Sequence, residues 1–249
     1  MADRAEMSTS FGAVAATYEA GRPDYPAEAV EWMLQPARVA DGAIRVADVG
    51  AGTGKLTRVA VGLGAEVVAI DPDTQMLATL LEHVSGVPTF SGTAEKLPLP
   101  DAGTDAVIIG QAWHWVDIDA ASTEIARVLR SGGALGLVWN LRDERIDWVR
   151  RMTEIMRPSN AEQMLADGPP TVAAPFGEAD HRTWHWSRPM TRESLFAMAR
   201  SRSYVVTAEA TERARIDAEL AELFDDVGAV GDTAVDLPYV TEAFRFVRP

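Results

Sequence analysis

A glycine-rich turn between two apolar segments constrains the fold of this chain more than any other stretch. Residues 44–49 are mostly apolar, and the sequence Gly50-Ala51-Gly52-Thr53-Gly54 follows them directly. An amphipathic segment over residues 55–63 then leads to a second apolar run, residues 66–70, which ends in Asp71. Short apolar runs joined through a helix are typical of neighbouring parallel strands. The pattern therefore predicts one strand–helix–strand unit.

The residue types in this unit suit the binding of a polar ligand. Glycine tolerates positive φ angles and lets a ligand approach the main chain closely. A helix that starts at Lys55 leaves its first backbone N–H groups without intrahelical partners, so they can face a negative or polar group. The carboxylate of Asp71 can accept hydrogen bonds from both hydroxyls of a ribose. A turn that only joined a strand to a helix would not explain this acid.

A dinucleotide-binding unit is the main alternative. Its fingerprint has a third glycine, or an alanine, three positions after the second glycine. Lys55 occupies that position here. Its long side chain would crowd the packing of helix on strand that a glycine permits. The sequence therefore disfavours a nicotinamide-dependent oxidoreductase.

The stretch Asp48-Val49-Gly50-Ala51-Gly52-Thr53-Gly54 resembles the first motif of the class I methyltransferases, which use S-adenosylmethionine. The resemblance implies that Asp48 and the five residues of the turn (Gly50, Ala51, Gly52, Thr53 and Gly54) contact this cofactor. It makes Asp71 the ribose-binding acid. It also implies cofactor contacts for Pro72 and Met76, with Met76 against the adenine ring.

Two later segments resemble further motifs of the same family. In residues 92–100, the backbone N–H of Ala94 would donate to an adenine ring nitrogen and Glu95 would accept from the exocyclic amine; the alternative is that Glu95 caps a helical turn. The sequence Gln111-Ala112-Trp113-His114-Trp115 resembles a stretch of small-molecule methyltransferases. There the Gln111 main chain would face the sulfonium. His114 would be a base facing the acceptor, since imidazole accepts protons near neutral pH, or it is structural.

The N-terminal region resembles the helical lid of small-molecule (type 11-like) methyltransferases, including those that act on trans-aconitate. The resemblance rests on Phe11-x-x-x-Ala15-x-x-Tyr18 and on the following Arg22-Pro23-x-Tyr25-Pro26. It implies that Tyr18 and Arg22 approach the methionine carboxylate of the cofactor, which an arginine can hold with two hydrogen bonds. The alternative is that Tyr18 only packs and Arg22 is a solvated loop charge.

Composition argues against several kinds of partner. The 249 residues carry a net charge of −14, whereas nucleic-acid binding needs a cationic stripe. The chain has no cysteine, which excludes disulfides and thiolate metal sites, and its histidines lack zinc spacing, so we expect no metal. No apolar run reaches the length of a membrane span and no signal-peptide pattern opens the chain. We therefore expect a cytoplasmic protein with no membrane or nucleic-acid partner.

The expected fold is a doubly wound α/β domain with a mostly parallel, seven-stranded, Rossmann-like sheet. The chain divides into lid helices (residues 1–40), the S-adenosylmethionine-binding core (residues 41–141), a cap and later helices inserted after strand five (residues 142–235), and a final antiparallel strand that completes the sheet (residues 236–249). Within the cap, residues 158–175 are expected to form a loop and residues 180–187 a half-buried strand.

The activity that the resemblance implies is methyl transfer from S-adenosylmethionine to an oxygen, nitrogen or carbon atom of a small-molecule acceptor. Besides the oxidoreductase, a cofactor-binding protein without methyl transfer is an alternative, because binding and catalytic residues largely coincide in this chemistry. Tryptophan-rich segments suggest an apolar or planar acceptor, whereas Arg142 and Arg22 would allow a carboxylate. The sequence therefore leaves the acceptor open, and it leaves the oligomeric state open as well.

Overall fold

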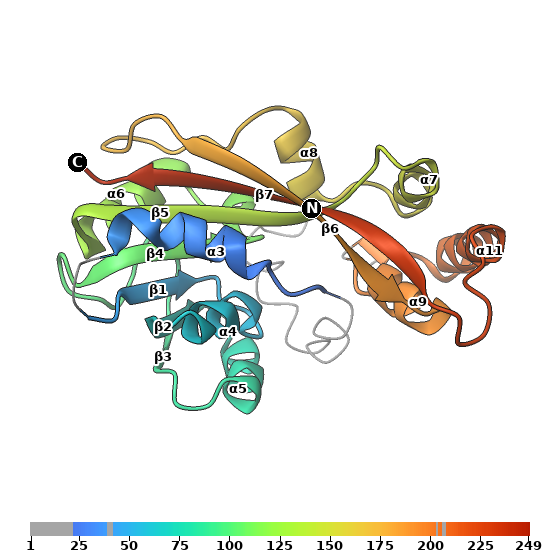
Figure 1. The fold of residues 1–249 in the computed structure, drawn as a ribbon, viewed down its shortest axis with the longest axis horizontal. Coiled ribbons are helices and arrows are strands. Elements are labelled where there is room, and N and C mark those ends of the chain that lie inside the picture. The colour runs from blue at the N-terminus through green and yellow to red at the C-terminus, as the bar shows by residue number, and fades with distance from the viewer. Residues whose placement is uncertain (1–21, 39–41, 203, 206–207) are drawn as a thin grey trace.

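The computed structural model describes residues 22–38, 42–202, 204–205 and 208–249. Within these residues, seven strands form a single sheet in the order β3-β2-β1-β4-β5-β7-β6, with helices on both faces (Figure 1). The strands are β1 (Arg45–Val49), β2 (Glu66–Asp71), β3 (Thr89–Ser91), β4 (Thr104–Gly110), β5 (Leu129–Arg142), β6 (Asp180–Met190) and β7 (Val235–Val247). The helices are α3 (Ala27–Leu34), α4 (Lys55–Gly62), α5 (Thr74–His83), α6 (Ile118–Val128), α7 (Asp147–Met156), α8 (Asn160–Ala166), α9 (Arg192–Arg200) and α11 (Ala210–Asp226), with short 3₁₀ turns η2 (Gln35–Ala37) and η3 (Trp113–Trp115).

The sheet is mixed, which corrects the expectation of a mostly parallel one. The pairs β3–β2, β2–β1, β1–β4 and β4–β5 are parallel. Strand β7 pairs antiparallel with both β5 and β6. The expected antiparallel last strand is therefore confirmed. The half-buried strand expected at residues 180–187 is also confirmed, and it forms the edge of this same sheet.

The strand order creates a switch point at the centre of the sheet. After β1 the chain proceeds outward through β2 to β3, and it then returns to place β4 on the other side of β1. Loops that leave β1 and β4 at their carboxyl ends must therefore diverge. In open α/β sheets, ligands bind in the crevice that such a divergence leaves.

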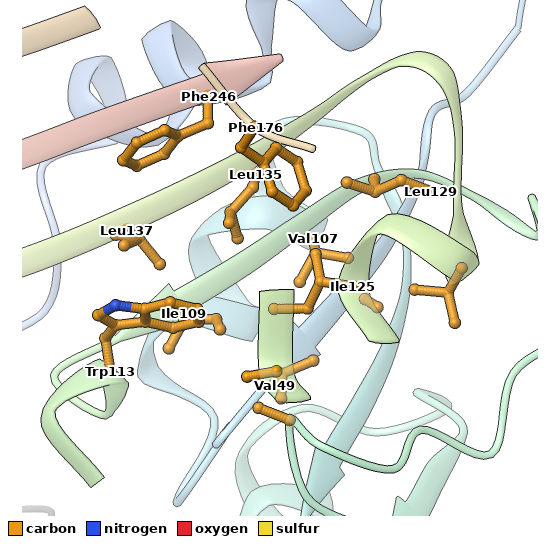
Figure 2. Close-up of a cluster of buried hydrophobic side chains, with 14 of the residues drawn as sticks. Val49, Val107, Ile109, Trp113, Ile125, Leu129, Leu135, Leu137, Phe176 and Phe246 are labelled. Carbon is orange, nitrogen blue, oxygen red and sulfur yellow. The ribbon is translucent and has the colours of Figure 1, made fainter. Parts of the chain in front are cut away.

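Alternation along the strands supplies apolar side chains to both faces. On one face, Val46, Ile108 and Val138 pack with residues of α3 and α4. On the other, Val107 and Ile109 of β4 and Leu135 and Leu137 of β5 pack beneath α6, as Figure 2 shows. Phe246 of β7 and Phe176 of the loop before β6 extend this second layer. The two layers pack against both faces of the central strands that carry the switch point.

Helices α7, α9 and α11 gather beyond one end of β6 and β7 (Figure 1). Their apolar residues share a cluster with Met190 at the end of β6 and with Leu237 and Tyr239 near the start of β7. Because β7 is antiparallel to β5, these positions lie at the end of the sheet where β5 finishes, and Arg142 is paired with Tyr239 there. The segment after β5 thus lies at the same end of the sheet as the switch point, where the parallel strands have their carboxyl ends.

Helix α8 corrects the expected loop over residues 158–175. Ser159 accepts from the backbone N–H of Glu162 at 3.3 Å, and Glu162 accepts from the backbone N–H of Ser159 at 2.6 Å. This reciprocal pair is a capping box, which satisfies two backbone donors at a helix start. Pro158 before the helix and Gly168, Pro169 and Pro170 after it hid this signal.

The helix expected around Phe11–Tyr18, and Tyr18 itself, lie outside the described residues. The division into lid, core and cap therefore stays a prediction.

Candidate functional site

The turn after β1 has the backbone that its glycines allow. The φ angles of Gly50, Gly52 and Gly54 are +71°, +54° and +88°, in the left-handed region that side chains disfavour. The N–H groups of Gly50 and Ala51 donate to the carbonyl of Ile70 in β2, at 2.8 and 3.1 Å. These bonds hold the turn across the ends of β1 and β2.

The three glycines differ in what surrounds them. A Cβ on Gly50 would lie 2.9 Å from the Cβ of Ala112, and one on Gly54 would lie 2.6 Å from Leu80 Cγ. A Cβ on Gly52 would meet no protein atom within 4 Å among the described residues. Gly50 and Gly54 are therefore glycines that packing requires, whereas Gly52 borders open space.

A cavity of about 470 Å³, partly open to solvent, lies at the switch point. It is bounded by the turn after β1, by the end of β4 and by the loop before α3. The lining residues are Arg22, Pro23, Tyr25, Asp48, Gly50, Ala51, Gly52, Thr53, Lys55, Leu56, Gly110, Gln111 and Asn140. The cavity therefore brings together seven of the residues singled out in the sequence: Arg22, Asp48, Gly50, Ala51, Gly52, Thr53 and Gln111.

Asp48 is the acid that lines this cavity, and its pKa is shifted. Its side chain is fully buried, and its Oδ2 accepts from the hydroxyl of Thr57 at 2.5 Å. Its Oδ1 is buried and accepts no hydrogen bond from the described residues. Burial raises the pKa of Asp48 to about 7, against the lowering effect of the Thr57 hydrogen bond. A cation or a donor in the cavity would find an acceptor here.

Asp71 braces the turn from β2. Its Oδ2 accepts from the N–H of Gly52 at 2.9 Å, and its Oδ1 accepts from the N–H of Asp73 at 2.8 Å. Burial raises the pKa of Asp71, and these two backbone hydrogen bonds oppose the rise. A carboxylate has about four acceptor positions, so Asp71 can hold the turn and still accept from a ligand.

The other residues predicted near an adenosine lie around Asp71 and beyond it. Pro72 follows Asp71 directly, and Met76 is buried on α5, which Asp73 caps. Ala94 is buried in the loop after β3. Glu95 accepts from the N–H of Asp117, the N-cap residue of α6, at 2.8 Å. Glu95 therefore holds the residue that precedes α6, and its expected contact with the adenine stays a prediction. None of these four residues lines the cavity described above.

Gln111 links β4 to the edge of the cavity in a strained conformation. Its φ angle is +58°, a region that costs a non-glycine residue about 1–2 kcal/mol. Its N–H donates to Val138 O at 3.0 Å, and its side chain donates to Asn140 O at 2.8 Å. Strain held by hydrogen bonds on a cavity wall is a common feature of functional sites.

His114 lies on η3, three residues after Gln111 in the sequence. Its ring centroid is 4.8 Å from that of Trp115, and its side chain is half-buried. Trp113 is core: it is 2% exposed, and its indole N–H donates to Thr171 O at 2.9 Å. His114 is not among the described residues that line the switch-point cavity. A catalytic role for His114 stays a prediction.

A second cavity of about 420 Å³ adjoins the first and shares Arg22, Pro23, Gln111 and Asn140 with it. Its other walls come from the end of β5, from α8, from α9 and the residues after it, and from β7. The residues that only this cavity contacts are Leu141, Arg142, Ser159, Glu162, Met198, Arg202 and Tyr239. The two cavities thus adjoin each other at Gln111 and Asn140, and the second is the more highly charged of the two.

Asn140 is the main site residue that sequence reasoning missed. Its side chain donates to Asp24 O at 3.1 Å and accepts from the hydroxyl of Thr241 at 2.7 Å. It thereby ties β5 to the loop before α3 and to β7. Its place directly after the apolar run of β5 was the available signal, because polar residues at the carboxyl ends of parallel strands face the crevice.

The described residues contain no cluster of acids and histidines that could hold a metal ion. None of the helices that the structure describes has the length and apolarity to cross a membrane.

Comparison with known proteins places these features in a family. A family model described as "Methyltransferase domain" matches residues 47–137. An uncharacterized methyltransferase of Mycobacterium tuberculosis is 42% identical over 248 residues, which cover 97% of each chain. A structure from Anaeromyxobacter dehalogenans, provisionally assigned as a type II methyltransferase, is 23% identical with a TM-score of 0.69, over 90% of this chain and 97% of that one.

A phosphoethanolamine N-methyltransferase of Haemonchus contortus, solved with S-adenosylmethionine, also shares the fold. It is 16% identical with a TM-score of 0.54, and the match covers 100% of this chain and 60% of that one. The resemblance to enzymes that act on trans-aconitate finds no counterpart among these matches.

Proposed function

Because this chain belongs to the methyltransferase family, we propose that it transfers a methyl group from S-adenosylmethionine to a small-molecule acceptor. Three things support the cofactor: the family, the presence of S-adenosylmethionine in a structure with the same fold, and the residues of the switch-point cavity. The acceptor would lie in the second cavity, which adjoins the first at Gln111 and Asn140.

The observation that carries the proposal is the environment of Gly52. Its positive φ and the open space beside it make the main chain accessible at the carboxyl edge of the sheet. Asp48 lines the same cavity with a carboxylate oxygen that no described residue satisfies. An exposed main chain and a buried acceptor together fit a ligand that carries both hydrogen-bonding groups and positive charge.

When bound, S-adenosylmethionine supplies a methyl group on a positively charged sulfur, which an electron-rich atom of the acceptor can displace. The chain's own residues then have three tasks. The turn around Gly52 and the carboxylate of Asp71 hold the adenosyl end, and Asp48 complements positive charge. Gln111 fixes the wall between the two cavities. Positioning of this kind, with exclusion of water, is the main catalytic contribution when the leaving group is already activated.

The nicotinamide alternative fits these residues less well. Lys55, which occupies the position of the third glycine in the dinucleotide fingerprint, starts α4 and reaches Asp24 at 3.6 Å. Its side chain therefore lies at the cavity, where the dinucleotide pattern requires close helix–strand packing. The methyltransferase relatives also favour methyl transfer over hydride transfer.

Two alanine variants test the placement of the cofactor. Gly52 and Gly64 both have a positive φ, +54° and +83°, and neither would meet a protein atom with an added Cβ. Each substitution should cost about 1–2 kcal/mol of stability from backbone strain. Only Gly52→Ala should weaken S-adenosylmethionine binding, by at least about tenfold, because only its Cβ enters the cavity. Equal affinities in the two variants would contradict the placement.

Methyl transfer itself is tested with methyl-labelled S-adenosylmethionine and a panel of small oxygen, nitrogen and carbon nucleophiles. We expect labelled product and S-adenosylhomocysteine in equal amounts from the wild type, and a reduced rate from Gly52→Ala at low cofactor concentration. Tight cofactor binding with no labelled product from any acceptor would instead support a cofactor-binding protein without methyl transfer.

A further inference from the structure

We infer that the acceptor carries an anionic oxygen group, a carboxylate or a phosphate, which Arg142 and Arg202 bind in the second cavity. This inference rests on the proposed function for the identity of the cavity as the acceptor site. It adds the chemical class of the acceptor, which neither the family nor the switch-point cavity specifies.

The two arginines are buried to an unusual degree. The side chains of Arg142 and Arg202 are only 3% and 7% exposed. They share a single carboxylate, that of Glu162, with N–O distances of 2.8 and 2.5 Å. Moving a charge out of water costs several kcal/mol unless a partner compensates it. Two guanidinium groups on one carboxylate leave one positive charge uncompensated in this pair of ion pairs.

A second cluster in the chain has the same composition, two arginines on one carboxylate, but its arginines are more exposed to solvent. Asp105 also binds two arginines, Arg45 and Arg130, at 3.2 and 2.8 Å. Those side chains are 51% and 28% exposed, so water solvates the extra charge. The arginines of the second cavity lack this solvation. Their arrangement is costly for an ion pair that only stabilises the fold, and it suits a cavity that receives an anion.

Hydrogen bonding leaves a donor available in the same place. Arg142 Nη2 donates to Thr153 Oγ1 at 2.9 Å and to Glu162 at 2.8 Å. Its Nε is buried and donates to none of the described residues. A buried guanidinium nitrogen without an acceptor is costly. An oxyanion in the cavity would provide the missing acceptor, with the paired geometry that arginine favours.

The protonation of the neighbouring groups is consistent with an excess of positive charge. Burial, together with the charge of Arg142, lowers the pKa of Arg202 to about 9, although the carboxylate of Glu162 opposes this shift. Burial alone would raise the pKa of Glu162, but Arg142 and Arg202 hold it at about 2. Burial raises the pKa of Tyr239, so its hydroxyl stays protonated at the cavity wall. At neutral pH the cavity therefore presents the ionised carboxylate of Glu162 and the neutral hydroxyl of Tyr239 beside three guanidinium groups, those of Arg22, Arg142 and Arg202.

The anion of this cavity is assigned to the acceptor, because Arg142 and Arg202 line only the second cavity. Arg22 lines both cavities, and it is expected to contact the methionine carboxylate of the cofactor rather than the acceptor. The alternative, that Arg202 holds the carboxylate of the cofactor, predicts a loss of cofactor affinity when Arg202 is replaced.

The test uses small anions as probes of the whole protein. Benzoate, succinate and inorganic phosphate are titrated by calorimetry, with and without saturating S-adenosylhomocysteine, and benzamide serves as the neutral match of benzoate. We expect benzoate or succinate to bind at least about tenfold more tightly than benzamide, or phosphate to do so if the acceptor is a phosphate ester. Equal binding of benzoate and benzamide, with no binding of phosphate, would overturn the inference.

Variants separate this result from the proposed function. Arg202→Gln should weaken the bound anion at least tenfold and leave S-adenosylhomocysteine affinity within twofold. Arg130→Gln removes an arginine from the Asp105 cluster at the other end of β5 and should change neither affinity. If Arg202→Gln does not fold, Arg202→Lys keeps the charge and should show an intermediate loss. Unchanged anion binding, or an equal loss of S-adenosylhomocysteine binding, would refute the assignment. Failure of the wild type to bind S-adenosylhomocysteine would count against the proposed function alone.

Discussion

Asp48→Asn should change how the stability of this protein depends on pH. The carboxyl group of Asp48 is fully buried beneath the glycine turn, and one of its oxygens lacks a hydrogen bond among the described residues. Burial raises its pKa from 3.8 to about 7. Asparagine has nearly the same shape and can still accept from Thr57, but it has no proton to release.

The sign of the effect follows from proton counting. Between pH 3.8 and about 7, the folded protein holds a proton on Asp48 that the unfolded chain has released. Stability therefore falls as pH rises through this window, by about 1.4 kcal/mol per pH unit for this one group. Over a window of roughly three units, the penalty reaches about 4 kcal/mol. It is absent below pH 3.8 and complete above about pH 7.

The assay is urea unfolding of the wild type and of Asp48→Asn at several pH values between 4 and 8. The difference between the two free energies of unfolding cancels the groups that titrate in both proteins. Relative to wild type, the variant should gain about 4 kcal/mol from pH 4 to pH 8. Asp232→Asn, at an exposed loop position, should show a constant difference. A constant difference for Asp48→Asn as well would refute the argument that burial controls this carboxyl.

Two further substitutions test other parts of the account. His114→Ala should lower the turnover number by about a hundredfold if the imidazole is a general base, while cofactor affinity stays within twofold; an unchanged turnover number would make His114 structural. Asp105→Asn should destabilise the protein by about 2 kcal/mol at pH 7. Burial raises the pKa of Asp105, but hydrogen bonds from Arg45 and Arg130 outweigh it and hold the pKa at about 2. This stability is present above pH 3.8 and is lost as pH falls through about 2, so urea unfolding should show the variant and wild type converging in acid.

The centre of the fold was predictable because its signals are local. Apolar runs, glycines and a strand-end acid lie within about thirty residues of one another. Burial in the sheet explains the apolar runs, and the backbone geometry of the turn explains the glycines. Asp48 and Gly52, which the same local pattern singled out, line the switch-point cavity. The alternation of residues 236–247 likewise identified the last strand, which pairs with β5.

The second cavity was not predictable, because its residues meet only through long-range pairing. Arg142 and Arg202 lie in different elements and are joined through Glu162 of α8. The expected loop over residues 158–175 concealed that helix, although the Ser159–Glu162 capping box was visible in the sequence. Alternation identified β6 as a strand, but only the pairing with β7 puts it at the edge of the main sheet. Burial of the arginines therefore depends on the tertiary structure and cannot be recognised in any short segment of sequence.

Calorimetric titration of the wild type with S-adenosylmethionine, S-adenosylhomocysteine and NAD tests the central claim most directly. Binding of both adenosyl-sulfur ligands at one site per chain, with no heat from NAD, is the result that the glycine turn, Asp48 and Asp71 predict. Binding of NAD without the adenosyl-sulfur ligands would contradict the account, and it would make Asp71 a dinucleotide-binding residue.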